Sequence, residues 1–310
     1  MNPKVTILFA SFNHERFVAD SVQSCLNQDY QPLKIYFSDD CSSDKTFEII
    51  TEIVGNYTGP HEVVLNRNDH NRYLDHIPDL VDQISEDFCV FAAGDDVHYP
   101  YRVSALTEAW RNSGASLIAS AARIIDAAGA PIGVHNVHRY EDDTFTLERF
   151  LRTGYNPTCF GASLACEKDL LRAFPMRNLG SRNEDFYLPF RALLLKGGAH
   201  LNTPLLDWRN HGSNTTLALK HQNASTELEK MLLEECDLLN RVANWHLVIS
   251  DAGIMNKKDL LKMPFNIVAN YAFQHINAIL TAWRPLRTRI ANTKAGSRTS
   301  VSSPDTSKSC

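Results

Sequence analysis

The chain has no excess of positive charge and no long apolar segment. Its 31 lysine and arginine residues are outnumbered by 36 aspartate and glutamate residues, which gives a formal net charge of −5. A surface that follows a phosphate backbone requires clustered basic side chains, so we expect no nucleic-acid partner. No stretch approaches the ~18 consecutive apolar residues that a membrane-spanning helix requires. The sequence therefore predicts neither a nucleic-acid-binding protein nor a transmembrane one.

The cysteine pattern disfavours two further kinds of site. The seven cysteines are scattered and odd in number, and no two of them are spaced as Cys-x-x-Cys. This pattern favours reduced thiols over a disulfide framework or a zinc site. Residues 1–4 lead directly into an apolar strand, without the charged and apolar regions of a secretory leader. We therefore expect a cytoplasmic protein.

Glycine is missing from the first polar loop, residues 11–16. A nucleotidylyltransferase would need a glycine- and arginine-rich triphosphate loop after its first strand. A dehydrogenase that uses NAD would need the Gly-x-Gly-x-x-Gly motif. The sequence disfavours both classes.

What the chain does contain is short apolar runs that alternate with segments of helical spacing. Apolar residues make up 44% of the sequence, which is enough for a large core. Strands that alternate with helices predict an α/β fold with a doubly wound, mostly parallel sheet and right-handed crossovers. The predicted strands are 5–10, 33–37, 62–65 and 88–93, and the predicted helices between them are 14–28, 46–54 and 74–84.

The pattern is less regular beyond residue 100. We expect a helix over 102–112, strands over 115–120, 123–126, 132–138 and 160–165, a capped helix over 181–198, and a strand over 199–206 followed by a polar loop from Asp207. From residue 226, two long apolar segments no longer alternate with strands. They predict a C-terminal helical appendage, and the composition of residues 291–310 predicts a disordered tail.

The most informative stretch is the run 88–93, because it ends in Gly94, Asp95 and Asp96. Such a run suits a strand buried on both faces, which places the two carboxylates where the strand emerges at the sheet edge. Adjacent carboxylates repel each other unless a cation lies between them. A divalent ion that is bound by one or two carboxylates and by substrate phosphates would remove this repulsion. The alternative is a solvated turn, because Gly-Asp-Asp is also ordinary turn chemistry.

Polar residues follow the other predicted strands in the same way. Loops after parallel strands meet at one edge of the sheet, which is where open α/β sheets bind ligands. Four polar loops on one edge are hard to explain as solvated turns alone, so we expect them to form one site. The loops are residues 11–13, 39–40, 66–68 and 95–96.

Three motifs carry a resemblance to a known family. They are Val5-Thr-Ile-Leu-Phe-Ala-Ser-Phe-Asn13, Phe37-Ser-Asp-Asp-Cys-Ser-Ser-Asp-Lys-Thr46 and Ala92-Ala-Gly-Asp-Asp-Val-His-Tyr-Pro-Tyr-Arg102. In this order and spacing, the chain resembles the inverting glycosyltransferase family 2 over residues 4–215. The resemblance implies the GT-A nucleotide-sugar fold, Mn²⁺ or Mg²⁺ as cofactor, and a UDP- or dTDP-sugar donor. It also implies a glycan or polyprenyl-linked saccharide acceptor and a role in bacterial surface polysaccharide synthesis.

The resemblance assigns roles to residues of the four loops. Asp39 would accept a hydrogen bond from the base, Asp95 would contact the ribose or the metal, and Asp96 would bind the metal. One departure is Ala93, which stands where many members have the first acid of Asp-x-Asp-Asp. The other residues expected to line the nucleotide are Ala10, Ser11, Asn13, and Arg67 or Asn68.

Glu184 and Asp185 resemble the Glu-Asp motif of the family, whose Asp serves as general base. The acceptor hydroxyl must lose a proton as it attacks the anomeric carbon, while a metal offsets the charge on the departing diphosphate. A single displacement then inverts the anomeric centre. We expect Asp185 to be the base and Glu184 to be its substitute or an acceptor contact. The alternative is structural, because acids are favoured in the first turn of any helix.

Trp208-Arg-Asn-His211 resembles the Tyr-Arg-x-His segment that ends many members of the family. Arg209 would hold the diphosphate through paired donors, and His211 would be a further metal or phosphate ligand. The alternative for His211 is an ordinary histidine in a surface loop.

The resemblance also divides the chain into parts. Residues 1–101 would form the nucleotide-sugar-binding half of the GT-A domain, residues 102–222 the acceptor-binding half, 223–290 the C-terminal helical region and 291–310 the disordered tail. The helical region would either lie on the inner face of the cell membrane or pack on protein, including a second copy of the chain. A non-catalytic nucleotide-sugar scaffold or sensor is the rival interpretation, which Ala93 favours and Asp96 and Asp185 oppose.

Overall fold

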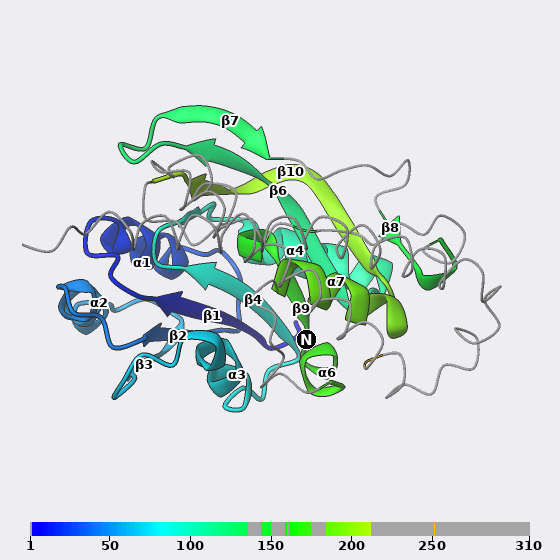
Figure 1. Ribbon diagram of the computed structural model, residues 1–310, viewed down its shortest axis with the longest axis horizontal. Helices are drawn as coiled ribbons and strands as arrows, with labels where there is room; N and C mark the ends of the chain where they lie inside the picture. The colour runs from blue at the N-terminus through cyan, green and yellow to red at the C-terminus, as the bar shows by residue number, and fades with distance from the viewer. Residues whose placement is uncertain are drawn as a thin grey trace, which may run out of the picture.

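The computed structural model describes residues 2–135, 144–149, 159, 161–174, 184–211 and 251. Within these residues, β-strands form a ten-stranded sheet with helices on both faces (Figure 1). The predicted appendage, apart from Asp251, and the predicted disordered tail lie outside the described residues. No helix in the described part of the chain is long and apolar enough to cross a membrane.

The parallel half of the sheet follows the predicted alternation of strands and helices. Its strands lie in the order β3-β2-β1-β4, and each neighbouring pair is parallel. The apolar runs that predicted these strands are buried; Leu8 and Phe9 of β1, for example, are fully enclosed. The elements are β1 (Val5–Ser11), α1 (Val18–Leu26), β2 (Leu33–Asp39), α2 (Thr46–Gly55), β3 (Glu62–Arg67), η1 (Tyr73–Asp75), α3 (His76–Val81) and β4 (Phe88–Ala93).

The second half extends the same sheet with mixed strand directions. Beyond β4 the order is β9-β6-β10-β5, with β7 paired to β6 and β8 to β10. β10 runs parallel to β6, whereas β9 is antiparallel to both β4 and β6. The elements are β5 (Val97–His98), α4 (Arg102–Ser113), β6 (Leu117–Ile125), β7 (Pro131–His135), β8 (Thr144–Phe145), η2 (Gly161–Ser163), β9 (Ala165–Glu167), α6 (Lys168–Arg172), α7 (Glu184–Leu194) and β10 (Gly198–Arg209).

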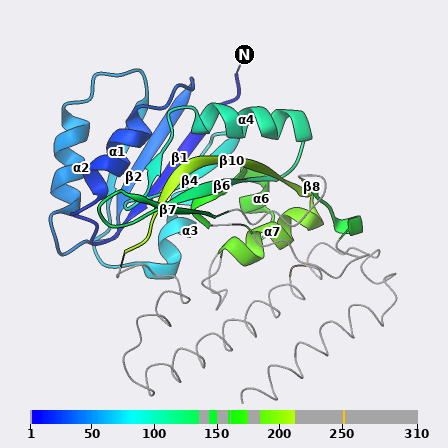
Figure 2. The ribbon, with the colours of Figure 1, turned by 90° about the horizontal axis from the view of Figure 1, so that it is seen from above.

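Two apolar cores lie on opposite faces of the sheet. One is formed with α1, α2 and α4, and includes Val22, Ile50 and Leu106. The other is formed with α3, α6 and α7, and includes Leu80 and Leu188. Figure 2 shows α4 on one side of the strands and α6 and α7 on the other.

Three of the expected elements differ from the structure. The two strands expected over 115–120 and 123–126 are the single strand β6, Leu117–Ile125, because the small residues at its centre are buried and continue the pairing. The expected strand over 160–165 is the 3₁₀ turn η2 followed by β9. The polar loop expected from Asp207 begins later, because β10 stays paired with β6 as far as Arg209. Because the pairing with β6 extends to Arg209, it orients this residue and places His211 two residues beyond the end of the strand.

A buried ion pair joins α7 to a distant position in the chain. Arg191 is fully enclosed and donates from Nε to Asp251 Oδ2 at 2.7 Å and from Nη2 to Asp251 Oδ1 at 3.2 Å. Its guanidinium also lies over the rings of Phe174 and Tyr187. Both partners are therefore satisfied within the core against which α7 packs.

Candidate active site

The loops that follow β1 and β2 are tied together by side-chain hydrogen bonds. The backbone N–H of Asn13 donates to Ser42 Oγ at 2.8 Å, and the N–H of Ser43 donates to Asn13 Oδ1 at 2.9 Å. Asn13 has a φ of 55°, a left-handed conformation that asparagine tolerates better than most residues. The N–H of His14 donates to Thr46 Oγ1 at 2.8 Å. The loops predicted to line a nucleotide thus hold each other in place.

Asp39 lies fully buried beneath these loops. Its carboxylate accepts hydrogen bonds from the backbone N–H and the hydroxyl of Ser42, at 2.9 and 2.5 Å, and from Ser11 Oγ at 3.4 Å. Arg67 Nε lies 3.7 Å from Asp39 Oδ2. A base N–H would therefore share this carboxylate with Ser42 and Ser11. In this conformation Asp39 organises the loop as a structural acceptor.

Asp40 organises the third loop, a role that the sequence did not reveal. It accepts from Asn68 Nδ2 at 2.7 Å and from the backbone N–H groups of Arg72 and Tyr73 at 2.7 and 2.8 Å. Tyr73 has a φ of 50°, which is unusual for an aromatic residue. The bonds from Asp40 hold the chain in that shape. The repeated Asp-Asp at the end of β2 was the available signal.

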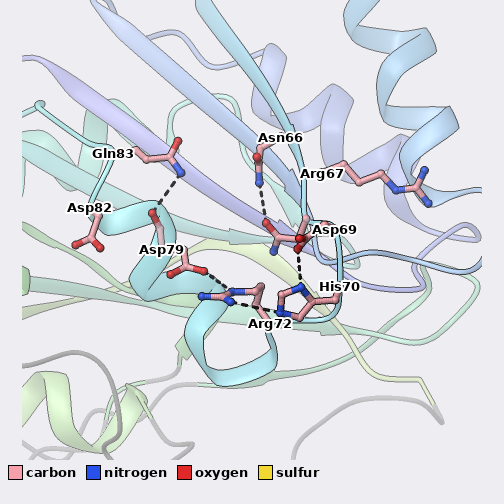
Figure 3. Close-up of a pocket in the computed structure, with 9 residues that line it drawn as sticks. Asn66, Arg67, Asp69, His70, Arg72, Asp79, Asp82 and Gln83 are labelled. Carbon is pink, nitrogen blue, oxygen red and sulfur yellow. Dashed lines mark hydrogen bonds and ion pairs between the residues drawn. The ribbon is translucent and has the colours of Figure 1, made fainter.

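A recess of about 610 Å³ lies beside the end of β3 (Figure 3). Its charged groups largely pair with each other: Arg72 Nε donates to Asp79 Oδ2 at 2.7 Å, and His70 Nδ1 contacts Asp69. In Figure 3 the Arg67 side chain points away from these pairs. The recess borders the predicted nucleotide residues, but Asp95 is not part of its wall. The lining residues are Asn66, Arg67, Asn68, Asp69, His70, Arg72, Asp79, Asp82 and Gln83.

Asp95 is brought next to two histidines at the end of β4. The N–H of Gly94 donates to Ala10 O at 3.0 Å, which continues the pairing of β1 with β4. Oδ2 of Asp95 lies 2.9 Å from His211 Nε2 and 3.8 Å from His14 Nε2. A carboxylate only accepts hydrogen bonds, so His211 Nε2 donates here. The sequence predicted Asp95 and His211 separately, and the structure places them in contact.

Asp95 and Asp96 lie in opposite electrostatic surroundings. Burial alone would raise the pKa of Asp95, but the hydrogen bond from His211 and the charges of the two histidines outweigh it and lower that pKa. Burial, followed by repulsion from Asp95, raises the pKa of Asp96 well above its ordinary value. Asp96 is 1% exposed and accepts from the N–H of Arg209 at 3.0 Å. Asp95 therefore carries the negative charge of the pair, whereas Asp96 is buried against the backbone of Arg209.

His14 is a site residue that the sequence analysis missed. Its ring packs against Gly94, where a Cβ would lie 2.6 Å from His14 Nδ1 and 2.8 Å from Ser11 Cβ. Nδ1 is buried and has no hydrogen-bond partner among the residues that the structure describes. Because Gly94 has no side chain, the imidazole of His14 can approach Asp95. The available signal was the position of His14, directly after Asn13 in the first polar loop.

Arg209 stabilises the backbone at Asp95. It is 4% exposed, and its Nε donates to the backbone carbonyl of Asp95 at 3.0 Å. Nη2 lies 3.4 Å from Asp20 Oδ2, and the guanidinium stacks 5.0 Å over the ring of Phe17. The same ring lies 4.7 Å from the ring of His211. The described contacts of Arg209 are thus with protein groups that fix Asp95 and His211.

Glu184 and Asp185 form the first turn of α7 and lie beside Gly161. A Cβ on Gly161 would lie 3.0 Å from Glu184 Oε1, and the N–H of Cys159 donates to Asp185 O at 3.3 Å. Desolvation by the surrounding protein, followed by repulsion from Asp185, raises the pKa of Glu184 to about 7. Glu184 is nevertheless an exposed residue, so it is accessible to a substrate. The pair is therefore accessible to a substrate, and the pKa of one of its carboxyls is raised to about 7.

The donor set around Asp95 fits a divalent cation with few protein ligands. Among the described residues, no group of three or more His, Cys, Asp or Glu side chains is placed to hold a metal ion. One carboxylate and one imidazole would leave most coordination positions to substrate phosphates and water, which is how Mg²⁺ is commonly bound. Carboxylate ligands also suit Mn²⁺. Asp95 and His211 therefore fit such an ion.

Comparison with known proteins identifies the class of this chain. Its sequence matches the model of Glycosyl transferase family 2 over residues 6–174, more than half of its length. The protein therefore belongs to glycosyl transferase family 2, a family of transferase enzymes. The resemblance inferred from the three sequence motifs is confirmed.

Individual relatives match over shorter segments. EpsE of Bacillus subtilis (strain 168), which is named as a glycosyltransferase, is 27% identical over 101 residues, or 33% of this chain and 36% of EpsE. An uncharacterized glycosyltransferase of Haemophilus influenzae is 38% identical over 52 residues, or 17% of this chain and 21% of that protein. The matched region is thus well under two thirds of either relative.

Solved structures share the fold at low sequence identity. TarS 1–349 of S. aureus in complex with UDP-GlcNAc has a TM-score of 0.55 and 13% identity, covering 94% of this chain and 92% of that one. The mannosyltransferase PcManGT from Pyrobaculum calidifontis, in complex with GDP-Man and Mn²⁺, has a TM-score of 0.53 and 13% identity, covering 94% and 84%. The predicted α/β fold with a large, mostly parallel GT-A sheet is confirmed.

The contact between Gly94 and His14 gives a first prediction. We expect Gly94→Ala to force His14 and the end of β1 away from Asp95, and to lower the free energy of unfolding by roughly 1–3 kcal/mol, the usual effect of overpacking. Urea denaturation measures the change. Gly133→Ala in β7 is the matched control, because a Cβ there would meet its nearest neighbour, Ile124, at an ordinary 3.7 Å. Equal stability of the two variants would contradict the contact.

Proposed function

We propose that this protein is a metal-dependent inverting glycosyltransferase that transfers a sugar from a nucleoside-diphosphate sugar to a saccharide acceptor. The observation that carries the proposal is the contact of Asp95 with His211 at the carboxyl edge of the sheet, at 2.9 Å. It supplies one oxygen and one nitrogen ligand beside the loops that line a nucleotide in this family. A solvated turn at Asp95 would not require a histidine from beyond the end of β10 as its partner.

The donor is held by the first three loops in this proposal. Phe12, at the end of β1, is 42% exposed although it is a large aromatic residue, and it offers a ring on which a base can stack. Ser11, Asn13 and Arg67 all bond to the β2 end or the loop after it, so the loops that carry them are already joined to each other. Because these loops are ordered before binding, less conformational entropy is lost when the nucleotide binds.

UDP or dTDP is the proposed nucleotide, and the UDP and UDP-GlcNAc complexes of TarS support it. The GDP-Man complex of PcManGT makes GDP the necessary comparison. The acceptor is proposed to be a glycan or a polyprenyl-linked saccharide of a bacterial surface polysaccharide. A cytoplasmic location, with the C-terminal helices at the membrane or in a dimer, remains part of the same proposal.

Asp95 and His211 would hold Mn²⁺ or Mg²⁺. Asp96 would support the site indirectly, because it accepts from the backbone N–H of Arg209, whose side chain donates to the backbone carbonyl of Asp95. When bound, the ion would offset negative charge on the diphosphate as it departs. His211 must give up its Nε2 proton to act as a ligand, because that proton now points at Asp95. His14 stands on the other side of the same carboxylate and would donate to a phosphate oxygen from Nε2. Mn²⁺ in the PcManGT complex supports this ion class.

Glu184 and Asp185 are proposed to deprotonate the acceptor. Asp185 takes the proton from the hydroxyl as its oxygen bonds to the anomeric carbon, and the sugar–phosphate bond breaks on the opposite side. Glu184, in the same first turn, holds the acceptor or shares the proton. The proximity of the two carboxyls keeps one proton near neutral pH, which makes the pair a stronger base than an isolated carboxylate.

Nucleotide binding tests the cation site. We expect the wild-type protein to bind UDP or dTDP more tightly with Mn²⁺ than with a chelator, and Asp95→Asn to lose at least about tenfold of that affinity because a ligand charge is gone. Isothermal titration with UDP, dTDP and GDP measures it. Asp29→Asn, which removes the same charge from an exposed position, should bind as wild type. No divalent-dependent affinity for any of the three would refute the metal site.

Turnover tests the proposed base. We expect Asp185→Asn to retain nucleotide affinity and to lose roughly 10²–10⁴-fold in kcat, since general-base catalysis typically contributes that much. Release of nucleoside diphosphate from the active donor, with acceptor present, measures kcat. Full activity of Asp185→Asn would dismiss the assignment. A wild-type protein that binds the donor and never turns over would instead favour the sensor interpretation.

The raised pKa of Glu184 predicts a pH dependence. Below about pH 7 Glu184 is protonated, and above it Glu184 is charged, so its negative charge makes Asp185 a stronger base and kcat/KM should rise through neutral pH. Glu184→Gln removes that ionisation at every pH. We therefore expect the acid limb of its pH profile to move to lower pH. A profile that matches wild type would show that Glu184 does not titrate with the base.

A further inference from the structure

Arg102, the first residue of α4, is a charged side chain held in the core. It is 1% exposed and is among the largest fully buried side chains of the described residues. Burial lowers its pKa to about 10, although the nearby Cys25 and Asp96 act to raise it. The guanidinium is therefore still charged at neutral pH. A buried cation is costly unless its donors are satisfied, so its partners indicate its role.

The guanidinium of Arg102 joins three segments of the chain. Nη1 donates to Phe91 O in β4 at 2.9 Å and to His98 Nδ1 in β5 at 3.0 Å. Nη2 donates to Ala162 O in η2 at 2.8 Å. His98 accepts in the neutral form, because burial and then the charge of Arg102 keep its pKa well below the ordinary value. The acceptors are thus two backbone carbonyls and a neutral ring.

Two of these segments lead to the two halves of the proposed site. β4 continues from Phe91 into Gly94 and the proposed cation ligand Asp95. η2 contains Gly161, which packs against the carboxyl of Glu184 at the start of α7. Arg102 therefore connects the strand that carries the cation site to the turn that supports the carboxylate pair.

Backbone pairing alone does not make this connection at η2. β4 pairs with β9 through Val90 and Ala165, and the N–H of Phe91 still donates to Leu164 O at 3.1 Å. η2 then leaves the strand ladder, and the bond from Arg102 reaches the turn at Ala162. A lysine at 102 has a single charged nitrogen and cannot reproduce the fork that spans both carbonyls.

We propose that Arg102 is a positioning residue that sets the distance between the cation site at Asp95 and the Glu184–Asp185 pair. The inference rests on the proposed transfer reaction. It separates two properties, because nucleotide binding does not require the Glu184–Asp185 pair, whereas turnover requires that pair and the cation site in register. A displacement of about 1 Å between reacting groups can lower a rate about 10²-fold.

The test uses Arg102→Lys and Arg102→Met in the full-length protein. UDP affinity with Mn²⁺ is measured by titration, and kcat and KM are measured at saturating donor. We expect UDP affinity to stay within about threefold of wild type, kcat to fall about 10–100-fold, and Arg102→Lys to lie between wild type and Arg102→Met. The matched control is Leu106→Ala, which removes a fully buried side chain one turn along α4 and makes none of these bonds.

Several outcomes would overturn the inference. Equal losses of UDP affinity and kcat would show general damage to the site, and a loss of kcat in Leu106→Ala as large as in Arg102→Lys would show an effect of stability. If Arg102→Met does not fold, Arg102→Lys and Gly161→Ala carry the test, since they perturb the same junction from either end and should be non-additive in kcat. Additive effects would contradict the connection.

The two proposals fail in distinguishable ways. A wild-type chain without turnover on any donor contradicts the proposed function and this inference with it. An active wild type whose Arg102→Lys variant keeps its kcat contradicts this inference alone.

Discussion

Two adjacent aspartates at the end of one buried strand repel each other, and the site is built around the way the fold gives each a different partner. Asp95 is held by His211 and Asp96 by the backbone N–H of Arg209. One partner is the last residue of β10 and the other lies two residues beyond it, so the arrangement depends on that strand running beside β6 as far as Arg209. Neighbouring carboxyls with divergent pKa values are a common way to divide chemical roles within one site.

The N-terminal half of the fold could be predicted from the sequence because its signals are local. Apolar runs such as 88–93 and the helical spacing between them gave the parallel sheet, and parallel strands bring their following loops to one edge. The position of Asp95 followed from the end of β4. The strand over 199–206 was also predicted, but its last residues were not, because Asp207 and Arg209 look like loop residues until strand pairing with β6 is known. Roles set by such distant pairing are invisible to local patterns.

The same limit explains the residues that were missed. His14 approaches Asp95 only because Gly94, far away in sequence, has no side chain. Arg102 is the last residue of the third motif, but its burial depends on contacts with β5 and η2 that the local sequence does not show. Ser42 and Asp39 satisfy each other within one short loop, so the sequence pointed to Asp39 without showing that its oxygens are already occupied. Composition shows which groups are available, and tertiary contacts determine which of them face a ligand.

The ion pair between Arg191 and Asp251 bears on where this enzyme can be shortened. Severing one partner of a buried pair typically destabilises a protein by about 3–5 kcal/mol, comparable to much of the stability of a small domain. A chain cut at residue 222, the expected end of the acceptor-binding half, would lose the carboxylate that Arg191 contacts inside α7. A shortened chain should therefore keep Asp251, because α7, which carries Glu184 in its first turn, is stabilised through Arg191 by a residue that follows the sheet by some distance in the sequence.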